Sequence, residues 1–174
     1  VHMPAHIYVR VGLYQKAIES NLRSLEADAR FQAIWSDNPL PMVGTYHLSH
    51  RLHPGHATDF LRYAGTLQGN FEIAISNAFQ LATSITQESV ALGQGQKRIA
   101  APWLVLKIFG RWDDLLNHEP AYQGTPYLDG IWAYSLGSAY LAKGNLQEAE
   151  KELEKLKAIA NAPDADKYRV GATP

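Results

Sequence analysis

The histidines in the first third of the chain are spaced so that their side chains could bind a metal ion together. Six of the seven histidines precede residue 57 in this chain of 174 residues. His2 and His6 are four residues apart, and His56 and Asp59 are three apart, so each pair would lie on one side of a helix. Two imidazoles at the four-residue spacing can share one metal ion. A mixed set of nitrogen and oxygen ligands would suit zinc or another divalent transition metal.

The same histidines have two other interpretations. Histidines near helix ends can cap backbone carbonyl groups, and Pro54-Gly55 supplies such an end. They could also line a pocket that binds a ligand without a metal. Pro4 stands between His2 and His6 and fits the first turn of a helix but not its interior, so it affects the geometry of that pair.

Four short sequences with a shared pattern predict turns between helices. Each has a glycine, any residue, an aromatic residue or leucine, and an alanine or leucine three residues further on. The four copies are Gly12-Leu13-Tyr14 with Ala17, Gly69-Asn70-Phe71 with Ala74, Gly110-Arg111-Trp112 with Leu115, and Gly144-Asn145-Leu146 with Ala149. Glycine commonly ends a helix because it adopts the left-handed conformation without strain, so each copy indicates a helical hairpin.

The apolar periodicity around these turns predicts an all-α fold of about eight helices in antiparallel pairs. The pairs cover residues 1–28, 56–86, 97–118 and 131–160. An inserted helix is expected over residues 41–53, where it would carry His47, His50 and His53. Residues 29–40 and 87–96 are expected to be non-helical, and Pro120 should shorten the second helix of the third pair.

The same periodicity predicts which side chains face inward. In the helix that begins at Tyr14, these are Ile18, Leu22 and Leu25. In the last helix an apolar stripe is expected, with charged residues such as Glu152 on the solvent face; the stripe is Leu146, Ala149, Leu153, Leu156 and Ala160. Gly137 and Ala149 are small, which lets the last two helices approach closely.

Composition and charge limit the classes of function. A net charge of −1 gives no electrostatic reason to expect nucleic acid or an anionic membrane as a partner. The sequence has no apolar run of about 18 residues, which is the length needed to span a membrane. There is no cysteine, which excludes disulfides, thiol nucleophiles and cysteine metal sites. We expect one helical domain over residues 1–161, cut from a longer array, and a tail over residues 162–174; the compartment, cytoplasmic or periplasmic, is left open.

The last hairpin carries a resemblance to a known family. Leu136-Gly137, Tyr140, Gly144, Ala149 and Leu153 have the spacing of a tetratricopeptide repeat, and the 34 residues from Gly110 to Gly144 equal its period. The intervals from Gly12 to Gly69 and from Gly69 to Gly110 are longer and indicate insertions. The chain therefore resembles a tetratricopeptide-repeat protein along nearly its whole length. His-Met-Pro-Ala-His-Ile-Tyr and Phe-Gly-Arg-Trp-Asp-Asp-Leu-Leu narrow the resemblance to bacterial repeat proteins without an assigned function.

This resemblance implies a right-handed α-solenoid that binds a ligand on its concave face. Our main hypothesis is a non-catalytic scaffold, without a cofactor, for a peptide or partner protein. The residues expected on the binding face are His6, Arg10, Asp59, Tyr63, Lys97, Lys107, Tyr134 and Ser138. The alternative is a metal-binding protein or metal-dependent hydrolase, because the family alignment places four potential ligands on that face: His2, His6, His56 and Asp59. A third hypothesis is a structural role in which the ends of the solenoid pair to form a homo-oligomer.

Overall fold

The computed structural model describes residues 1–35, 42–43, 46–47, 54–91, 95–163 and 165. Within these ranges the regular secondary structure is helical apart from one short β-ladder, which confirms the all-α class. The chain divides into two compact units, Val1–Asn77 and Ala78–Pro174, and each is described by itself. No helix among the described residues is long and apolar enough to cross a membrane.

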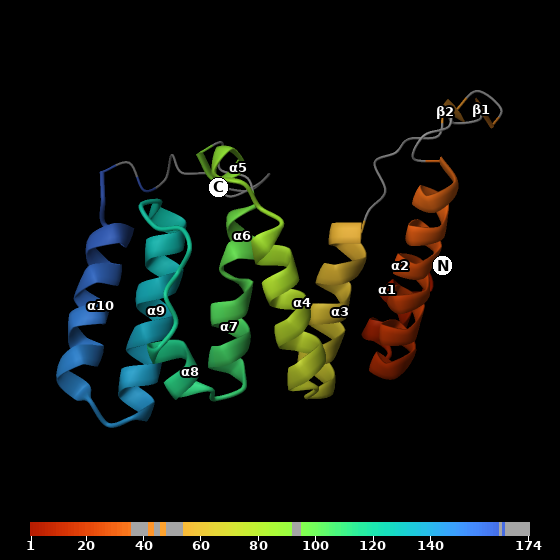
Figure 1. Cartoon of the computed structure of the whole chain (residues 1–174). Coiled ribbons are helices and arrows are strands. Elements are labelled where there is room, and N and C mark those ends of the chain that lie inside the picture. The colour runs from red at the N-terminus through yellow and green to blue at the C-terminus, as the bar shows by residue number, and fades with distance from the viewer. Residues whose placement is uncertain (36–41, 44–45, 48–53, 92–94, 164, 166–174) are drawn as a thin grey trace. The chain divides into compact units, whose positions relative to one another are not determined.

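Unit 1, as we call residues 1–77, consists of helices packed in neighbouring pairs (Figure 1). Its elements are α1 (Pro4–Arg10), α2 (Tyr14–Trp35), α3 (Pro54–Gln68) and the first half of α4 (Phe71–Thr83). Buried residues of α1, α2 and α3 form its core, which consists of Ala5, Ala17, Ile18, Leu61 and Ala64. Gly65 lies close to Ile73 and Ala74, which brings α3 and α4 together.

Three sequence predictions for unit 1 are wrong. Helix α2 continues to Trp35 instead of ending near residue 28, because no glycine or proline interrupts the chain before Pro39. Met42–Val43 (β1) and Tyr46–His47 (β2) pair as antiparallel strands where a helix was expected. Valine and tyrosine favour strands, which explains the difference. The rest of the expected inserted helix, with His50 and His53, lies outside the described residues.

The third correction concerns the inward face of α2. Leu22 was expected in the core but is 52% exposed, whereas the neighbouring Asn21 is completely buried. Ile18 is buried as expected, and Leu25 packs against the core from its edge. The inward face of the helix is therefore shifted from Leu22 toward Ala17 and Asn21, while Ile18 stays within it.

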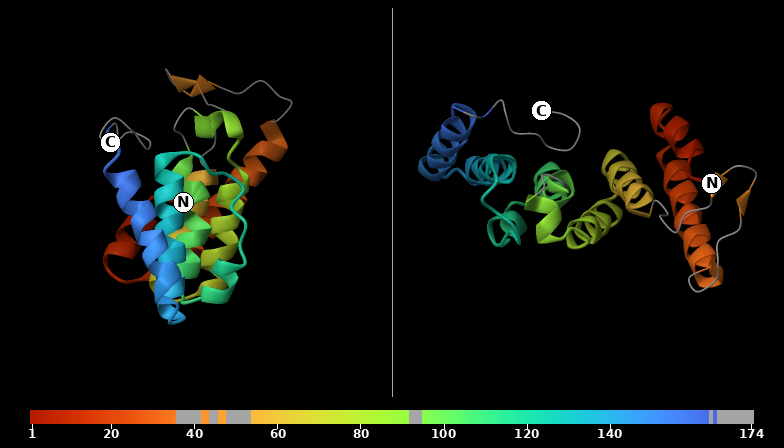
Figure 2. Two further views of the ribbon diagram at one scale, coloured as in Figure 1. Left: turned by 90° about the vertical axis from the view of Figure 1, so that its left-hand side faces the viewer. Right: turned by 90° about the horizontal axis from the view of Figure 1, so that it is seen from above.

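Unit 2, residues 78–174, begins with the second half of α4. Its further helices are α5 (Gln87–Ala91), α6 (Gln96–Ile99), α7 (Ala101–Ile108), α8 (Trp112–Leu116), α9 (Pro126–Ala142) and α10 (Leu146–Ala160). Helix α5 lies where a loop was predicted. Helix α8 ends at Leu116, before Pro120, which confirms the short helix. The top view in Figure 2 shows α9 and α10 side by side as a hairpin.

The turn pattern of the sequence is confirmed at all four copies. The four glycines have positive φ angles, of 75° at Gly12, 77° at Gly69, 66° at Gly110 and 77° at Gly144. At the end of α9, the Gly144 N–H donates to the Leu141 carbonyl at 3.0 Å and the Asn145 N–H donates to the Tyr140 carbonyl at 2.9 Å. Hydrogen bonds of the same two types close the other three turns. This pair of bonds is the Schellman motif, which requires the left-handed conformation that glycine adopts most easily.

The face of α10 that contacts α9 differs from the predicted one. Glu152 was expected in solvent but is only 6% exposed, whereas Leu146 and Leu153 are 66% and 48% exposed. A Cβ atom added to Gly137 would lie 3.3 Å from the Glu152 Cβ, so the predicted close approach of the two helices is confirmed. The side chain closest to Gly137 is that of Glu152, which directly precedes Leu153 of the predicted stripe.

Candidate metal centre

Three histidine side chains meet in unit 1. One ring nitrogen from each of His2, His6 and His56 can be chosen so that all three lie within 4.8 Å of one another. The Nε2 atoms of His2 and His6 are 3.0 Å apart. The nitrogen ligands of a tetrahedral zinc ion stand about 3.3 Å apart, because each Zn–N bond is about 2.0–2.1 Å long. The His2–His6 pair is thus near the required separation, and the most distant pair must close by up to about 1.5 Å.

The start of α1 determines how His2 and His6 meet. Pro4 occupies the first turn of the helix, so His2 precedes the helix instead of lying within it. The turn nevertheless continues backwards, because the Ala5 N–H donates to the His2 carbonyl at 2.9 Å and the His6 N–H donates to the Met3 carbonyl at 3.2 Å. The helical four-residue spacing is therefore kept across the proline.

Helix α2 holds the segment before α1 through two buried polar side chains, which bond to Val1 and His2. The Nδ1 atom of His2 lies 2.6 Å from Oδ1 of Asn21, and the Nδ2 group of Asn21 donates to the Ala17 carbonyl at 2.8 Å. The hydroxyl of Ser20 donates to the Val1 carbonyl at 2.5 Å. Asn21 and Ser20 are both buried. The segment before α1 is therefore attached to α2 at two successive residues.

Phe60 forms an apolar wall beside the histidines. Its ring centroid lies 5.0 Å from that of His2, 4.4 Å from that of His6 and 5.2 Å from that of His56. The imidazoles also contact one another: the ring centroid of His56 lies 4.6 Å from that of His2 and 5.7 Å from that of His6. His2 and His6 are half-buried and His56 is exposed. The cluster thus has a protected side against the core and an open side toward solvent.

The carboxylate expected as a fourth ligand lies one turn further along α3. Asp59 accepts a hydrogen bond from Nε of Arg62 at 2.7 Å, and these two side chains form an ion pair. The cluster of potential ligand atoms consists of the three histidines, without Asp59.

Two other residues expected on the binding face, Arg10 and Tyr63, lie in α1 and α3. His47, expected on the inserted helix, lies in β2.

The remaining residues expected on the binding face lie in unit 2. Lys97 is in α6, and Lys107 in α7 places its ammonium group 4.7 Å from the ring centroid of Tyr134 in α9. That distance is typical of a cation–π contact. Tyr134 and Ser138 both line a groove between α9 and α10. The structure therefore brings together Lys107, Tyr134 and Ser138 from this set.

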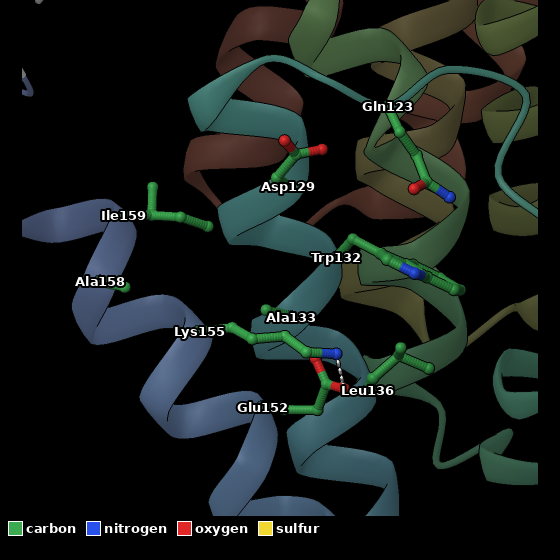
Figure 3. A pocket seen from close by; sticks show the side chains of 9 residues that line it. All are labelled: Gln123, Asp129, Trp132, Ala133, Leu136, Glu152, Lys155, Ala158 and Ile159. Atoms are coloured by element: carbon green, nitrogen blue, oxygen red, sulfur yellow. Dashed lines mark hydrogen bonds and ion pairs between the residues drawn. The ribbon is translucent and has the colours of Figure 1, made fainter. Parts of the chain in front are cut away.

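The α9–α10 hairpin has a hollow on each of its two sides. The first, of about 470 Å³, is the groove just described and is mostly apolar; its walls include Leu141, Leu146 and Leu153. The second, of about 460 Å³, contains Trp132, Asp129 and Gln123, as Figure 3 shows. Glu152 and Lys155 line this second hollow, and their side chains are 2.6 Å apart in an ion pair (Figure 3).

A smaller cavity of about 360 Å³ in unit 2 contains His118, Trp103 and Phe79. The His118 ring lies 5.8 Å from the Phe79 ring and 6.0 Å from the Trp132 ring, measured between centroids. Burial among these apolar groups lowers the pKa of His118 below its ordinary value, because the charged imidazolium is poorly solvated there. His118 is thus biased toward its neutral form.

Sequence reasoning did not find Asn21 or Phe60 as parts of the histidine site. Asn21 follows Ala17 of the turn pattern by four residues, so the two lie on the same face of α2. This spacing was the signal that could have placed Asn21 in the interior. Phe60 similarly follows His56 by four residues on α3. Both residues are positioned by the packing of α1, α2 and α3 around one point.

Comparison with known proteins found no match: no family model matches the sequence, and neither a curated protein nor a solved structure does.

Proposed function

We propose that this chain binds a divalent transition metal, with zinc as the best fit, through His2, His6 and His56. The observation that supports the proposal is the convergence of three ring nitrogens within 4.8 Å from two segments about fifty residues apart in sequence. Imidazole suits zinc, copper, iron and nickel, and three histidines without a thiolate favour zinc in a tetrahedral site.

The exposed side of the cluster supports a site with one open position. Three protein ligands leave the fourth position of a tetrahedral zinc ion to water, as in catalytic zinc sites. Structural zinc sites are instead closed by four protein ligands. The proposal therefore includes a metal-bound water on the solvent side of His56, and it assigns no reaction to that water.

The test is zinc titration of protein prepared without a histidine tag and stripped of metal by a chelator. We expect about one equivalent of zinc to bind, and His56→Ala to weaken the affinity at least tenfold. Because His56 is exposed, this variant should remain folded. His118→Gln is the matched control, since it removes a histidine outside the cluster. Binding of less than about one tenth of an equivalent, or equal loss in the two variants, would overturn the proposal.

A separate observation supports a second function, the scaffold role expected from the sequence. The α9–α10 groove exposes Leu141, Leu146 and Leu153, and its edge carries Glu150, whose carboxylate has no ion-pair partner among the described residues. We propose that this groove binds an amphipathic helix of a partner protein, with its apolar face on the leucines and a basic residue near Glu150.

A fluorescent amphipathic peptide of leucine and lysine, compared with one of leucine and glutamate, tests this second function. The lysine peptide should bind more tightly. Leu146→Ser with Leu153→Ser should weaken the binding of both peptides by interrupting the apolar wall, and Glu150→Gln should reduce the difference between them. These leucines are exposed, so the variant should fold. Equal binding of the two peptides to the wild-type protein would contradict the groove as a docking site.

A further inference from the structure

Asn21 has the geometry of a residue that prepares His2 for a metal ion. The Nδ2 group of its amide faces the carbonyl of Ala17 at 2.8 Å. A backbone carbonyl can only accept a hydrogen bond, so the amide nitrogen must be on that side. The amide oxygen is then the atom that faces His2 at 2.6 Å. The orientation of the Asn21 side chain is thereby determined by α2 itself.

This orientation selects one tautomer of His2. The Asn21 Oδ1 atom has no hydrogen, so the Nδ1 atom of His2 must carry the proton and donate it. In a neutral imidazole the other nitrogen, Nε2, is then unprotonated and has a free lone pair. That Nε2 atom is the one that lies 3.0 Å from His6. The lone pair of His2 therefore points into the cluster before any ion is present.

Burial makes this selection firm. Asn21 and Ala17 are both completely inaccessible to solvent, so water does not compete for the amide. The Asn21 amide uses its oxygen toward His2 and one of its N–H groups toward the helix backbone. Among the described residues no buried side-chain nitrogen or oxygen lacks a hydrogen-bond partner. A rotation of the His2 ring would leave the amide oxygen unsatisfied in the core, which is unfavourable.

We infer that Asn21 is a positioning residue for the metal site: it holds His2 in the Nδ1–H tautomer with Nε2 aimed at the ion. This inference rests on the proposed metal binding. Histidine ligands commonly donate their second N–H to a carboxylate or carbonyl oxygen, and loss of that partner typically weakens metal affinity by 10–100-fold. Asn21 acts on the ion through His2 and does not contact it.

The closing experiment compares wild type with Asn21→Leu, which is similar in size but cannot accept a hydrogen bond. Ile18→Val is the matched control, because Ile18 is buried in the same core and has no link to an imidazole. We expect zinc affinity, measured by competition with a chromophoric chelator, to fall roughly 10–100-fold in Asn21→Leu and to change little in Ile18→Val. Circular dichroism establishes that each variant is folded.

A second measurement does not depend on the metal. Long-range ¹H–¹⁵N NMR spectra of the metal-free protein report which nitrogen of each histidine carries the proton. Wild type should show His2 protonated at Nδ1, and Asn21→Leu should show a mixture of tautomers. Asn21→Asp loses the hydrogen bond to the Ala17 carbonyl but keeps an acceptor oxygen toward His2, so Nδ1 of His2 should remain protonated in this variant. It tests the same point if Asn21→Leu does not fold.

The outcomes separate the two proposals. If wild type binds no zinc, the proposed function fails and the positioning role fails with it. If wild type binds zinc and Asn21→Leu binds it equally well, only the positioning role of Asn21 is overturned. The same conclusion follows if His2 of the wild type is protonated at Nε2.

Discussion

The histidine cluster of unit 1 and the α9–α10 hairpin of unit 2 arrange polar and apolar groups in opposite ways. In unit 1 the polar side chains converge, with His2, His6 and His56 in contact and Asn21 buried behind them. In unit 2 a buried carboxylate, Glu152, lies between the helices while Leu146 and Leu153 remain exposed. Converging polar groups suit an ion, whereas exposed apolar groups suit a partner surface.

The comparison shows that helical hairpins with the same type of turn can carry different kinds of site. The turns depend only on backbone geometry, since each needs a glycine with positive φ and two hydrogen bonds. The side chains between the turns determine the chemistry. Four predictions test how far the two regions differ.

The largest expected effect contrasts the same residue type in the two regions. Leu61 is 2% exposed in the core of unit 1, whereas Leu153 lies on the open groove. Leu61→Ala should lower the free energy of unfolding by about 2–5 kcal/mol, because it leaves a cavity in the core. Leu153→Ala should change it by less than about 0.5 kcal/mol. Urea denaturation followed by circular dichroism measures both. Similar losses in the two variants would show that Leu153 is buried in solution, by self-association or otherwise.

The next effect concerns the close approach of α9 and α10. Gly137→Val should destabilise the protein by about 1–3 kcal/mol, because even its Cβ atom would lie 3.3 Å from the Glu152 Cβ and its methyl groups closer still. Gly130→Ala on the same helix should stabilise it by about 0.5–1 kcal/mol, since its Cβ would lie at an ordinary 3.6 Å from Leu156. Thermal unfolding distinguishes the two. A neutral Gly137→Val variant would contradict the packing described for this hairpin.

A smaller effect tests the buried carboxylate of unit 2. Lys155→Met should cost about 1–2 kcal/mol, because it removes the cation paired with Glu152 at 2.6 Å and leaves that carboxylate between the helices. Lys151→Met is the control, since its partner Glu148 is more exposed, and it should cost less than about 0.5 kcal/mol. Chemical denaturation at low salt measures the difference. Zinc affinity should be the same in both variants, because neither lysine is in the histidine cluster.

The smallest effect is the pH dependence due to His118. Burial lowers its pKa in the folded state below the ordinary value of 6.5, so the unfolded state binds more protons as the pH falls below that value. The contribution of neutral His118 to the free energy of unfolding is therefore fully present above pH 6.5 and is lost as the pH falls. His118→Gln should reduce this decrease by less than about 1 kcal/mol, since the ring is only half-buried. Unfolding curves at several pH values between 5 and 8 measure it. A pH profile unchanged by the substitution would show that His118 is well solvated.

Part of this molecule could be predicted because the signals are local in the chain. Glycine at Gly12, Gly69, Gly110 and Gly144 ends each helix through its own backbone conformation, and no distant residue is required. The pairing of His2 with His6 is local in the same sense, because a turn places residues four apart on one side. The short α8 also follows from Pro120 nearby.

The sequence by itself determined where the hairpins turn, and it indicated His2, His6 and His56 as candidate ligands. Only the tertiary structure decided which face of each helix points inward. In α2 it buries Asn21 instead of Leu22, and in α10 it buries Glu152 instead of Leu153. In both helices the buried residue is the one directly before the leucine that apolarity predicts. An apolar stripe constrains the facing of a helix only loosely, because the neighbouring helices select the side chains that fit against them. Through that selection Asn21 came to lie behind His2.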